Sequence, residues 1–353
     1  MKLFVKLLKI ILVGIIIVVL AYFVGPKVDA PNLENSAAAV PADLVELETL
    51  ITNREAAIQN IRPDNEARII WADTLPSKTP YSIVYLHGWS ASQEEGDPIH
   101  IETAKKYGCN LYLPRLAGHG LSEEEPMLNL TAEQLLDSAR EALEVGKKLG
   151  EQVILMGTST GGTLALYLAA KNPEIAGLLL YSPNIEIFDP SAKLLSGPWG
   201  LQILRAVKGG DYHEFDNVSD LQNQYWTTKY RVEALPQLQI LMDNTMTEET
   251  FGLVKQPLFL GYYYKDDIHQ DSTVSVPAML RMYDQLGTPA TKRQKVAFPN
   301  VGDHVMTSYI TSKDLESVKK ETFDFMEVIM GLKPKEVISL NDKKESHSEL
   351  LLE

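Results

Sequence analysis

The sequence has 353 residues, 45% of them hydrophobic, which is enough to bury one large core. Its 33 lysines and arginines are outnumbered by 47 aspartates and glutamates, so the formal net charge is −14 at pH 7. Nucleic-acid binding requires a concentrated basic face, and we therefore expect no nucleic-acid partner. With Cys109 as its single cysteine, the chain has no internal disulfide and no cysteine-based zinc site.

Residues 1–25 form a segment apart from the rest. Three lysines precede an uncharged apolar run at residues 10–24, and with residues 7 and 8 this stretch approaches the roughly 20 residues that cross a bilayer. We expect membrane contact through residues 7–24, with the lysine-bearing N-terminus in the cytoplasm. The segment is then a transmembrane signal-anchor, and the body of the protein is membrane-anchored and extracytoplasmic (periplasmic or extracellular). The alternative is a signal peptide cleaved after Val28-Asp29-Ala30, which leaves a secreted protein.

The body is predicted to be flanked by two less regular segments. Residues 26–60 indicate a tether followed by a packing helix. Their first part is rich in proline, asparagine and alanine, and residues 43–58 carry leucine and isoleucine on roughly one helical face. At the other end, residues 333–353 are charged and are predicted to be disordered.

From residue 61 onward, short apolar strands alternate with helices. Strands are predicted at residues 68–71, 82–86, 110–113, 152–156, 177–181, 258–264 and 294–298. Helices are predicted at residues 131–149, 163–170, 277–286 and 312–330, and the first opens with the capping box Thr131-Ala132-Glu133-Gln134. This alternation predicts a mostly parallel sheet covered by helices on both faces.

The alternation stops at residues 185–256. This segment contains helical fragments, broken at Gly197-Pro198 and Gly209-Gly210, and it is rich in aromatic residues. We expect these aromatics to form the core of a small helical cap, and some of them to line an apolar pocket. The predicted core domain therefore comprises residues 61–184 and 257–332.

A sharp turn after the predicted strand at residues 152–156 carries the strongest chemical signal. The turn reads Gly157-Thr158-Ser159-Thr160-Gly161-Gly162. Small residues two positions either side of a serine allow a strained strand-to-helix turn that exposes the hydroxyl above the sheet edge. We predict that Ser159 is a nucleophile.

A serine nucleophile needs a base, and the base needs a carboxylate to fix its tautomer. In parallel-sheet hydrolases the chain order is serine, then acid, then histidine. His304 fits as the base, because it follows the last predicted strand in a short glycine-containing loop, Gly302-Asp303-His304. The simpler alternative is a capping or surface histidine.

The acid is expected in the turn after the strand at residues 258–264. Asp271 is the first choice, because a β-branched residue and the next helix follow it closely. Asp267 is the alternative acid. Asp266, Asp267, His269 and Asp271 also allow a metal site, but a solvated acidic turn is the simpler interpretation, and we expect neither metal nor cofactor.

A developing oxyanion needs two fixed N–H donors. We expect the backbone N–H of Thr160, next after the nucleophile, to be one of them. The other is the backbone N–H of Trp89, which follows His87-Gly88 at the end of a predicted strand. Both are main-chain roles, so the side chains at these positions constrain the prediction little.

These motifs resemble the α/β-hydrolase superfamily, and in particular its lid-bearing serine hydrolases, which include monoacylglycerol lipase-like, lysophospholipase-like and carboxylesterase enzymes. The matching residues are His87-Gly88-Trp89, residues 113–120 (Leu-Pro-Arg-Leu-Ala-Gly-His-Gly), residues 157–162, Asp271 and Gly302-Asp303-His304. The resemblance spans about residues 66–330. It implies an α/β-hydrolase fold with a cap at residues 185–256, and an acyl-enzyme mechanism without cofactor in which His304 activates Ser159. The loop at residues 265–270 is longer than the usual turn of the family.

The sequence therefore predicts a serine hydrolase that cleaves a carboxylic ester with a triad of Ser159, Asp271 and His304. A small-molecule or lipid ester is the expected substrate, and a lipid-like ester fits a protein tethered to a membrane. Amide or peptide cleavage and acyl transfer on the same triad are alternatives that the motif does not separate. A non-catalytic binding protein that retains the fold is a further alternative.

Overall fold

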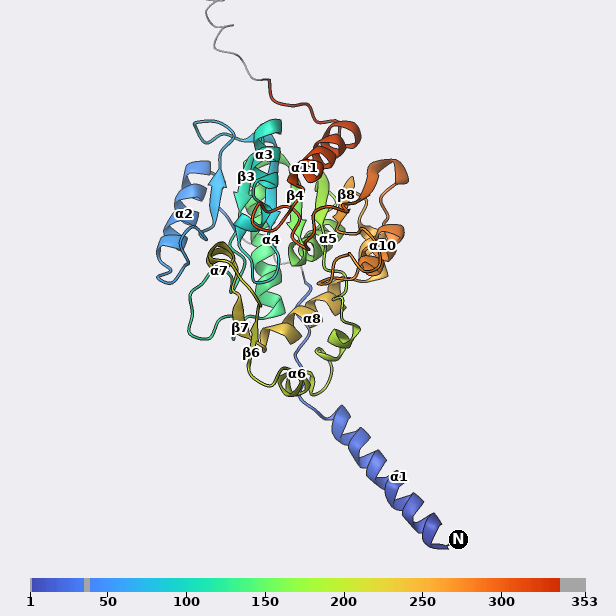
Figure 1. Ribbon diagram of the computed structural model, residues 1–353. Coiled ribbons are helices and arrows are strands. Elements are labelled where there is room, and N and C mark those ends of the chain that lie inside the picture. The colour runs from blue at the N-terminus through green and yellow to red at the C-terminus, as the bar shows by residue number, and fades with distance from the viewer. Residues whose placement is uncertain (1, 35–38, 337–353) are drawn as a thin grey trace, which may run out of the picture.

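A seven-stranded sheet runs through the centre of the protein in the computed structural model, which describes residues 2–34 and 39–336 (Figure 1). The strand order is β1-β3-β2-β4-β5-β8-β9, and all neighbours are parallel except β1 and β3. The strands are β1 (Arg68–Ile70), β2 (Thr79–Leu86), β3 (Asn110–Leu113), β4 (Gly150–Thr158), β5 (Gly177–Tyr181), β8 (Leu258–Tyr262) and β9 (Arg293–Ala297). The predicted, mostly parallel α/β sheet is confirmed.

Helices cover both faces of this sheet, because its strands are apolar on both sides. Along β2, Val84 and Leu86 face one buried cluster, whereas Ile83 and Tyr85 face the other. The first cluster packs against α2 (Leu44–Ala56), α4 (Ala132–Leu149), α5 (Thr160–Lys171) and α10 (Val276–Gln285). The second packs against α3 (Ile99–Tyr107) and α11 (Leu315–Asp324), which a π-helical stretch, Phe325–Ile329, continues.

A buried ion pair joins α2 to the body. The Glu55 carboxylate accepts hydrogen bonds from the Arg115 guanidinium at 2.7 and 3.2 Å, and the two side chains are only 5% and 9% exposed. The same carboxylate accepts the backbone N–H of Ala67 at 3.0 Å. Arg115 in turn donates to the His119 carbonyl at 3.2 Å, so the pair holds the loop at residues 114–120 in a fixed shape.

A cap is inserted between β5 and β8. It contains α6 (Gly200–Lys208), α7 (Asp220–Tyr225), α8 (Ala234–Thr245) and α9 (Glu248–Leu253). It also contains a short antiparallel hairpin of β6 (Tyr212–Glu214) and β7 (Lys229–Arg231), which the sequence does not predict. α8 packs on α4 and α5, whereas α9 packs on α5 and α10. These two cap helices therefore rest on the helices that cover one face of the sheet.

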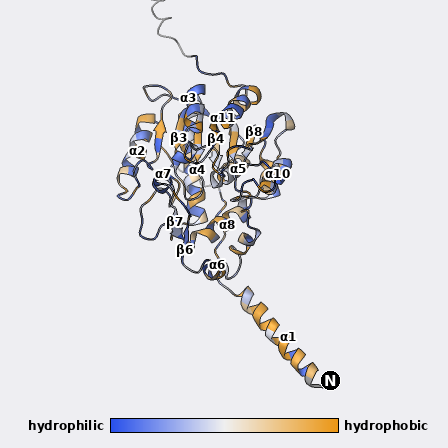
Figure 2. Ribbon diagram, viewed as in Figure 1, coloured by the Kyte–Doolittle hydropathy of each residue, from blue (hydrophilic) through white to orange (hydrophobic). Residues whose placement is uncertain are grey.

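Helix α1 (Lys2–Phe23) projects from the body at the end where α6 lies (Figure 1). Apart from the lysines near its N-terminal end it is apolar (Figure 2), and residues 4–23 are long and apolar enough to cross a membrane, a test that a signal sequence also passes. Trp199, just before α6, binds the end of this helix. Its indole N–H donates to the Ala21 carbonyl at 3.0 Å, and its backbone N–H donates to the Pro26 carbonyl at 2.8 Å.

Parts of the flanking segments predicted from the sequence lie outside the described residues, namely residues 35–38 and 337–353. Within the predicted tether, the Tyr167 hydroxyl donates to the Leu33 carbonyl at 2.9 Å, so residue 33 lies against α5. The predicted packing helix corresponds in position to α2, in which Leu47 and Ile51 are buried.

The turn between β4 and α5 has no room for a residue larger than glycine at positions 157 and 161. A Cβ atom at Gly161 would lie 1.8 Å from the Leu86 carbonyl oxygen at the end of β2, and one at Gly157 would lie 2.5 Å from the Gly161 backbone. Both obstacles are backbone atoms, which cannot move without distorting β2 or the first turn of α5. The glycines thus let α5 begin directly against two neighbouring strands.

We expect Gly161→Ala to destabilise the protein by more than about 3 kcal/mol, because the added methyl group overpacks against fixed backbone. Gly252→Ala in α9 is the matched control. A Cβ atom at Gly252 meets nothing within 4 Å, so this substitution should stabilise the protein by about 0.5–1 kcal/mol through helix propensity. Thermal unfolding of the full chain in detergent, followed by circular dichroism, measures both. Equal unfolding temperatures for wild type and Gly161→Ala would contradict the steric account.

Candidate active site

Ser159 occupies a strained turn at the end of β4. Its backbone has φ 53° and ψ −119°, a region that residues other than glycine rarely adopt. Neighbouring backbone holds the turn, since the Ser159 N–H donates to the Tyr181 carbonyl at 3.0 Å and its carbonyl accepts the Asn184 N–H at 3.0 Å. Strand β5 therefore fixes the turn from one side, and the first turn of α5 continues it on the other.

His304 and Asp271 form a buried hydrogen-bonded pair. His304 Nδ1 lies 2.6 Å from Asp271 Oδ2. The other carboxylate oxygen, Oδ1, accepts the backbone N–H groups of Thr273 and Val274 at 2.9 and 3.0 Å. The Asp271 side chain has no exposed surface, and that of His304 is 13% exposed. The carboxylate thus fixes the orientation of the imidazole ring and directs Nε2 away from itself.

The electrostatics of the pair follow from this arrangement. Burial alone would raise the pKa of Asp271, but the charge and hydrogen bond of His304 and the two backbone N–H donors outweigh it and hold that pKa below its ordinary value. Burial alone would lower the pKa of His304. The Asp271 carboxylate reverses this effect, so the pKa of His304 lies above its ordinary value of 6.5. The pair therefore favours an ionised Asp271 carboxylate beside a protonated His304 imidazole.

Ser159 and His304 line the same cavity, which has a volume of about 860 Å³. His304 Nε2 is buried, and none of the described residues forms a hydrogen bond with it. The remaining lining is largely apolar and comes from the cap. It includes Ile187, Leu194, Leu195, Ile203, Leu204, Val207, Phe215, Trp226, Leu235 and Leu238. The base candidate therefore faces an apolar space between the sheet edge and the cap.

The other acidic residues of the turn after β8 lie apart from the Asp271–His304 pair. Asp267 is exposed and accepts the Tyr264 hydroxyl at 2.8 Å. Asp266 accepts the His269 backbone N–H at 2.8 Å and also binds the ring of the same histidine. Among residues 2–34 and 39–336, no group of three or more His, Cys, Asp or Glu side chains is arranged to hold a metal ion. The structure therefore brings Asp271, but not Asp267, to His304.

The two backbone N–H groups expected to bind an oxyanion are free of partners in the described part of the chain. Neither the Trp89 nor the Thr160 N–H donates a hydrogen bond there. Leu116 N–H donates to His87 Nε2 at 3.1 Å, so the neutral ring carries its proton on Nδ1 and donates it to the Gly88 carbonyl at 3.0 Å. Burial keeps the ring neutral by lowering the pKa of His87 to about 3.

This hydrogen bond orients the peptide between Gly88 and Trp89. In a trans peptide the N–H points opposite to the carbonyl. Since His87 holds the carbonyl, the Trp89 N–H is directed away from His87. The His87 side chain thus fixes the orientation of the backbone in the motif His87-Gly88-Trp89.

Sequence reasoning missed one residue of this cavity, Glu95. It is 2% exposed and lines the cavity together with Ser159 and His304. It lies in the segment Gln93-Glu94-Glu95-Gly96, whose composition is typical of an ordinary polar turn. The only local signal is its position a few residues after His87-Gly88, and the burial itself comes from segments distant in the chain.

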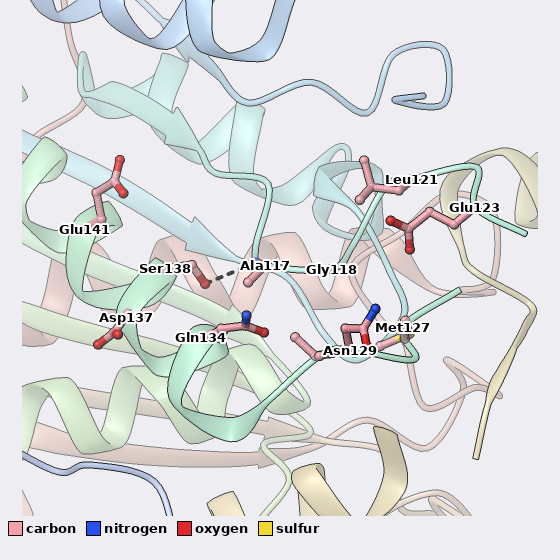
Figure 3. A pocket seen from close by; sticks show the side chains of 11 residues that line it. Ala117, Gly118, Leu121, Glu123, Met127, Asn129, Gln134, Asp137, Ser138 and Glu141 are labelled. Carbon is pink, nitrogen blue, oxygen red and sulfur yellow. Dashed lines mark hydrogen bonds between the residues drawn. The ribbon is translucent and has the colours of Figure 1, made fainter. Parts of the chain in front are cut away.

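A second cavity of about 650 Å³ lies between the loop after β3 and the start of α4 (Figure 3). Its walls include the carboxylates of Glu123, Asp137 and Glu141, and the Ser138 hydroxyl accepts the Ala117 N–H at 3.2 Å. Its lining contains no histidine or lysine that would serve as a base for Ser138. The larger cavity at Ser159 is therefore the candidate active site.

Comparison with known proteins shows the family to which this chain belongs. A model of the alpha/beta hydrolase family matches residues 83–309, which is more than half of the chain and includes Ser159, Asp271 and His304. The chain belongs to the alpha/beta hydrolase family.

Individual relatives add detail. A thermostable monoacylglycerol lipase from Bacillus sp. (strain H-257) is 30% identical over 118 residues, which are 33% of this chain and 46% of that protein. The match thus spans about half the length of that relative. The solved structure of the metagenome-derived lipolytic enzymes LipS and LipT aligns with a TM-score of 0.61 and 18% identity, over 76% of this chain and 99% of that one. A monoacylglycerol lipase from Paleococcus ferrophilus aligns with a TM-score of 0.54 and 13% identity, over 74% and 97%. At these identities the structures show the shared fold.

We expect Asp271→Asn to lower the pKa of His304, because burial still penalises the imidazolium and the main anion that opposed burial is gone. An NMR titration of the ring-labelled histidines in the full chain measures it. Asp267→Asn is the control and should leave the pKa of His304 unchanged, because the Asp267 carboxylate is bonded to the Tyr264 hydroxyl instead. An unchanged His304 titration in Asp271→Asn would contradict the assignment of Asp271 as its partner.

Proposed function

We propose that the protein is a serine hydrolase that cleaves a carboxylic ester through an acyl-enzyme, with Ser159 as nucleophile, His304 as base and Asp271 as the acid of the triad. One observation carries the proposal. The Asp271–His304 pair leaves the imidazole Nε2 without a partner in the described structure, within the same cavity that Ser159 lines. An imidazole oriented by a buried carboxylate beside a strained serine is the arrangement that activates a hydroxyl group.

The reaction follows from these positions. As Ser159 Oγ forms a bond to the ester carbonyl carbon, His304 Nε2 takes the hydroxyl proton, and the charge moves onto the carbonyl oxygen. The free N–H groups of Trp89 and Thr160 bind that oxyanion. Collapse of the intermediate breaks the bond to the alcohol oxygen, which receives the proton from His304. A water molecule, deprotonated by the same Nε2, then attacks the acyl-serine, and the acid is released with Ser159 protonated again.

A lipid-like ester is the substrate that the cavity and the N-terminus support best. The cavity is apolar on its cap side, and three of its lining residues are exposed to solvent as well: Leu194 at 49%, Ile203 at 36% and Val207 at 78%. These residues lie in the segment that binds the end of α1 through Trp199. An anchor helix that ends there brings the apolar edge of the cap to the surface of a bilayer. The lipases among the similar proteins agree with such a substrate.

In this proposal α1 is an uncleaved signal-anchor and the hydrolase domain lies outside the cytoplasm. The contact of Trp199 with Ala21 and Pro26 supports an anchor that stays attached, because a cleaved segment would leave the indole without this partner. Trp199 also suits the place, since tryptophan is enriched where a helix leaves the bilayer.

Ser159→Ala and His304→Ala should each lower kcat/KM for p-nitrophenyl esters by on the order of 10⁴- to 10⁶-fold, and Ser159→Ala should abolish labelling by a fluorophosphonate probe. Asp271→Asn should cost on the order of 10⁴-fold because the imidazole loses its fixed tautomer, whereas Asp267→Asn should retain full activity. The assays use the full chain in detergent. A wild-type protein that neither binds the probe covalently nor turns over any ester would overturn the proposal.

Val207→Asp should reduce hydrolysis of a long-chain monoacylglycerol dissolved in phosphatidylcholine vesicles by at least about tenfold, because a carboxylate at the lip of the cavity opposes contact with the bilayer. Hydrolysis of a water-soluble butyrate ester should change by less than twofold. Leu75→Asp is the matched control. Leu75 is similarly exposed at 74%, but it precedes the N-terminal end of β2, away from the cavity. Equal losses on both substrates would argue against a bilayer-facing lip.

A further inference from the structure

Tyr85 carries a hydroxyl group that is buried behind the candidate active site and takes no part in the reaction described above. The side chain extends from β2 and has no exposed surface. Its ring lies edge-on against His100, with 4.8 Å between the ring centroids. A Cβ atom at Gly96 would lie only 2.6 Å from Tyr85 Cζ, the carbon that bears the hydroxyl. Close packing therefore fixes the position of this hydroxyl group.

The hydroxyl supports the backbone that presents the Trp89 N–H. Glu95 Oε2 accepts both the Tyr85 hydroxyl, at 3.1 Å, and the Gly88 N–H, at 2.5 Å. The His87 ring binds the Gly88 carbonyl, so side chains hold this glycine from both of its polar groups. Because the two donors share one carboxyl oxygen, the position of the Tyr85 hydroxyl helps to determine that of the Gly88 amide. The N–H expected to bind the oxyanion belongs to the next residue.

The same hydroxyl reaches the strand that carries the candidate nucleophile. Its oxygen lies 3.0 Å from Thr158 Oγ1, and Thr158 is the last residue of β4, directly before Ser159. A hydroxyl group can donate one hydrogen bond and accept others, so Tyr85 holds both partners at once. It thus links the end of β4 to the loop after β2.

The loop that carries His304 is joined to the same residues. Three positions further on, the Thr307 hydroxyl donates to the Glu95 main-chain carbonyl at 2.8 Å and lies 3.3 Å from the Thr158 hydroxyl. Thr307 has no exposed surface. The contacts therefore close into a hydrogen-bond ring, whose members are Tyr85, Glu95, Thr158 and Thr307.

Core packing alone does not account for this hydrogen-bond ring. Phenylalanine in place of the tyrosine and valine in place of a threonine would fill nearly the same space without burying a hydroxyl group, which is costly unless it is hydrogen-bonded. The ring instead joins three loops, and each of them carries one group of the proposed reaction. These groups are the Trp89 N–H, Ser159 and His304.

We propose that Tyr85 is a positioning residue of this site: its hydroxyl fixes the Trp89 N–H relative to Ser159, at the place where the oxyanion forms. The proposal rests on the proposed hydrolase function. A donor to an oxyanion must be held to fractions of an ångström, whereas binding of the uncharged ester in an apolar cavity depends little on that donor. Loss of the hydroxyl should therefore weaken the transition state and leave substrate binding nearly unchanged.

Tyr85→Phe should lower kcat for a p-nitrophenyl ester by about 10- to 100-fold and change KM by less than about threefold. The Ki of a trifluoromethyl ketone, whose adduct with a serine carries an oxyanion, should rise by the same factor as kcat/KM falls. Tyr107→Phe is the matched control and should keep the wild-type kcat. Tyr107 also donates to a glutamate at 3.1 Å, but its partner Glu327 belongs to the π-helical stretch after α11 rather than to a loop of the site.

Three results would overturn the positioning role. They are a kcat for Tyr85→Phe within about twofold of wild type, a loss confined to KM, and an equal loss of kcat in Tyr107→Phe. Thr307→Val interrupts the hydrogen-bond ring at a second point and should also lower kcat without changing KM. Because the two hydroxyl groups act through one ring, the double variant should lose less than the product of the two single losses. Losses that multiply would contradict the ring.

The Gly88 amide can be observed without any substrate, which separates this proposal from the hydrolase proposal. Histidine precedes glycine only at His87-Gly88 and His119-Gly120, so the full chain in detergent, labelled with carbonyl-¹³C histidine and ¹⁵N glycine, has two carbon-coupled amide NMR signals. Tyr85→Phe should shift the Gly88 signal and leave the Gly120 signal in place. A Gly88 signal that does not shift overturns the positioning role whether or not the protein hydrolyses esters. If the signal shifts but wild type turns over no ester, the link from Tyr85 to the Gly88 amide stands and the hydrolase function fails.

Discussion

The site depends on one backbone constraint, the positive φ of Ser159 at the end of β4. Positive φ also occurs near the ends of the two strands beside β4, at Ser182 directly after β5 and at Ser90 in the loop after β2. Such conformations are strained for a residue with a side chain, and they persist only where the surroundings hold them. Here the close approach of Gly161 to the Leu86 carbonyl does so. The packing of three buried strands therefore maintains the geometry at the edge of the sheet.

Two buried carboxyl groups near His304 show how local donors decide protonation. Asp271 has two backbone N–H donors and an imidazole, and these hold its pKa low despite its burial. Glu95 is equally buried, but only one N–H group, that of Gly88, and the Tyr85 hydroxyl donate to it, so burial prevails and raises its pKa to about 7. Burial penalises both anions alike, and the number of hydrogen bonds to the charged form separates them.

The sequence predicts well those features that are encoded within a few residues. The alternation of strands and helices along the chain, the capping box at Thr131 and the turn at Ser159 each follow from local pattern, and the structure bears out these elements. The placement of Asp271 against His304 agrees with the sequence, although their catalytic roles stay predictions. Glu95 was missed because a glutamate in a polar turn becomes buried through contacts that include segments distant in the chain, such as Thr307, whose hydroxyl donates to the Glu95 carbonyl. The β6–β7 hairpin was missed for a related reason, since its strands of three residues are too short to show alternation.

In the proposed hydrolase, the same distinction explains why the reaction and the substrate preference are encoded in different parts of the chain. A reaction needs atoms fixed to fractions of an ångström, and strands packed on both faces provide that precision for Ser159 and the backbone N–H of Trp89. A substrate with a flexible acyl chain needs volume and an apolar path rather than fixed atoms. The cap supplies these through residues such as Leu204 and Val207, whose side chains tolerate exchange for others of similar size. Trp199 lies in the cap and binds the end of α1. The cap, whose side chains the proposed reaction constrains least, is therefore also the part of the protein nearest to the proposed membrane.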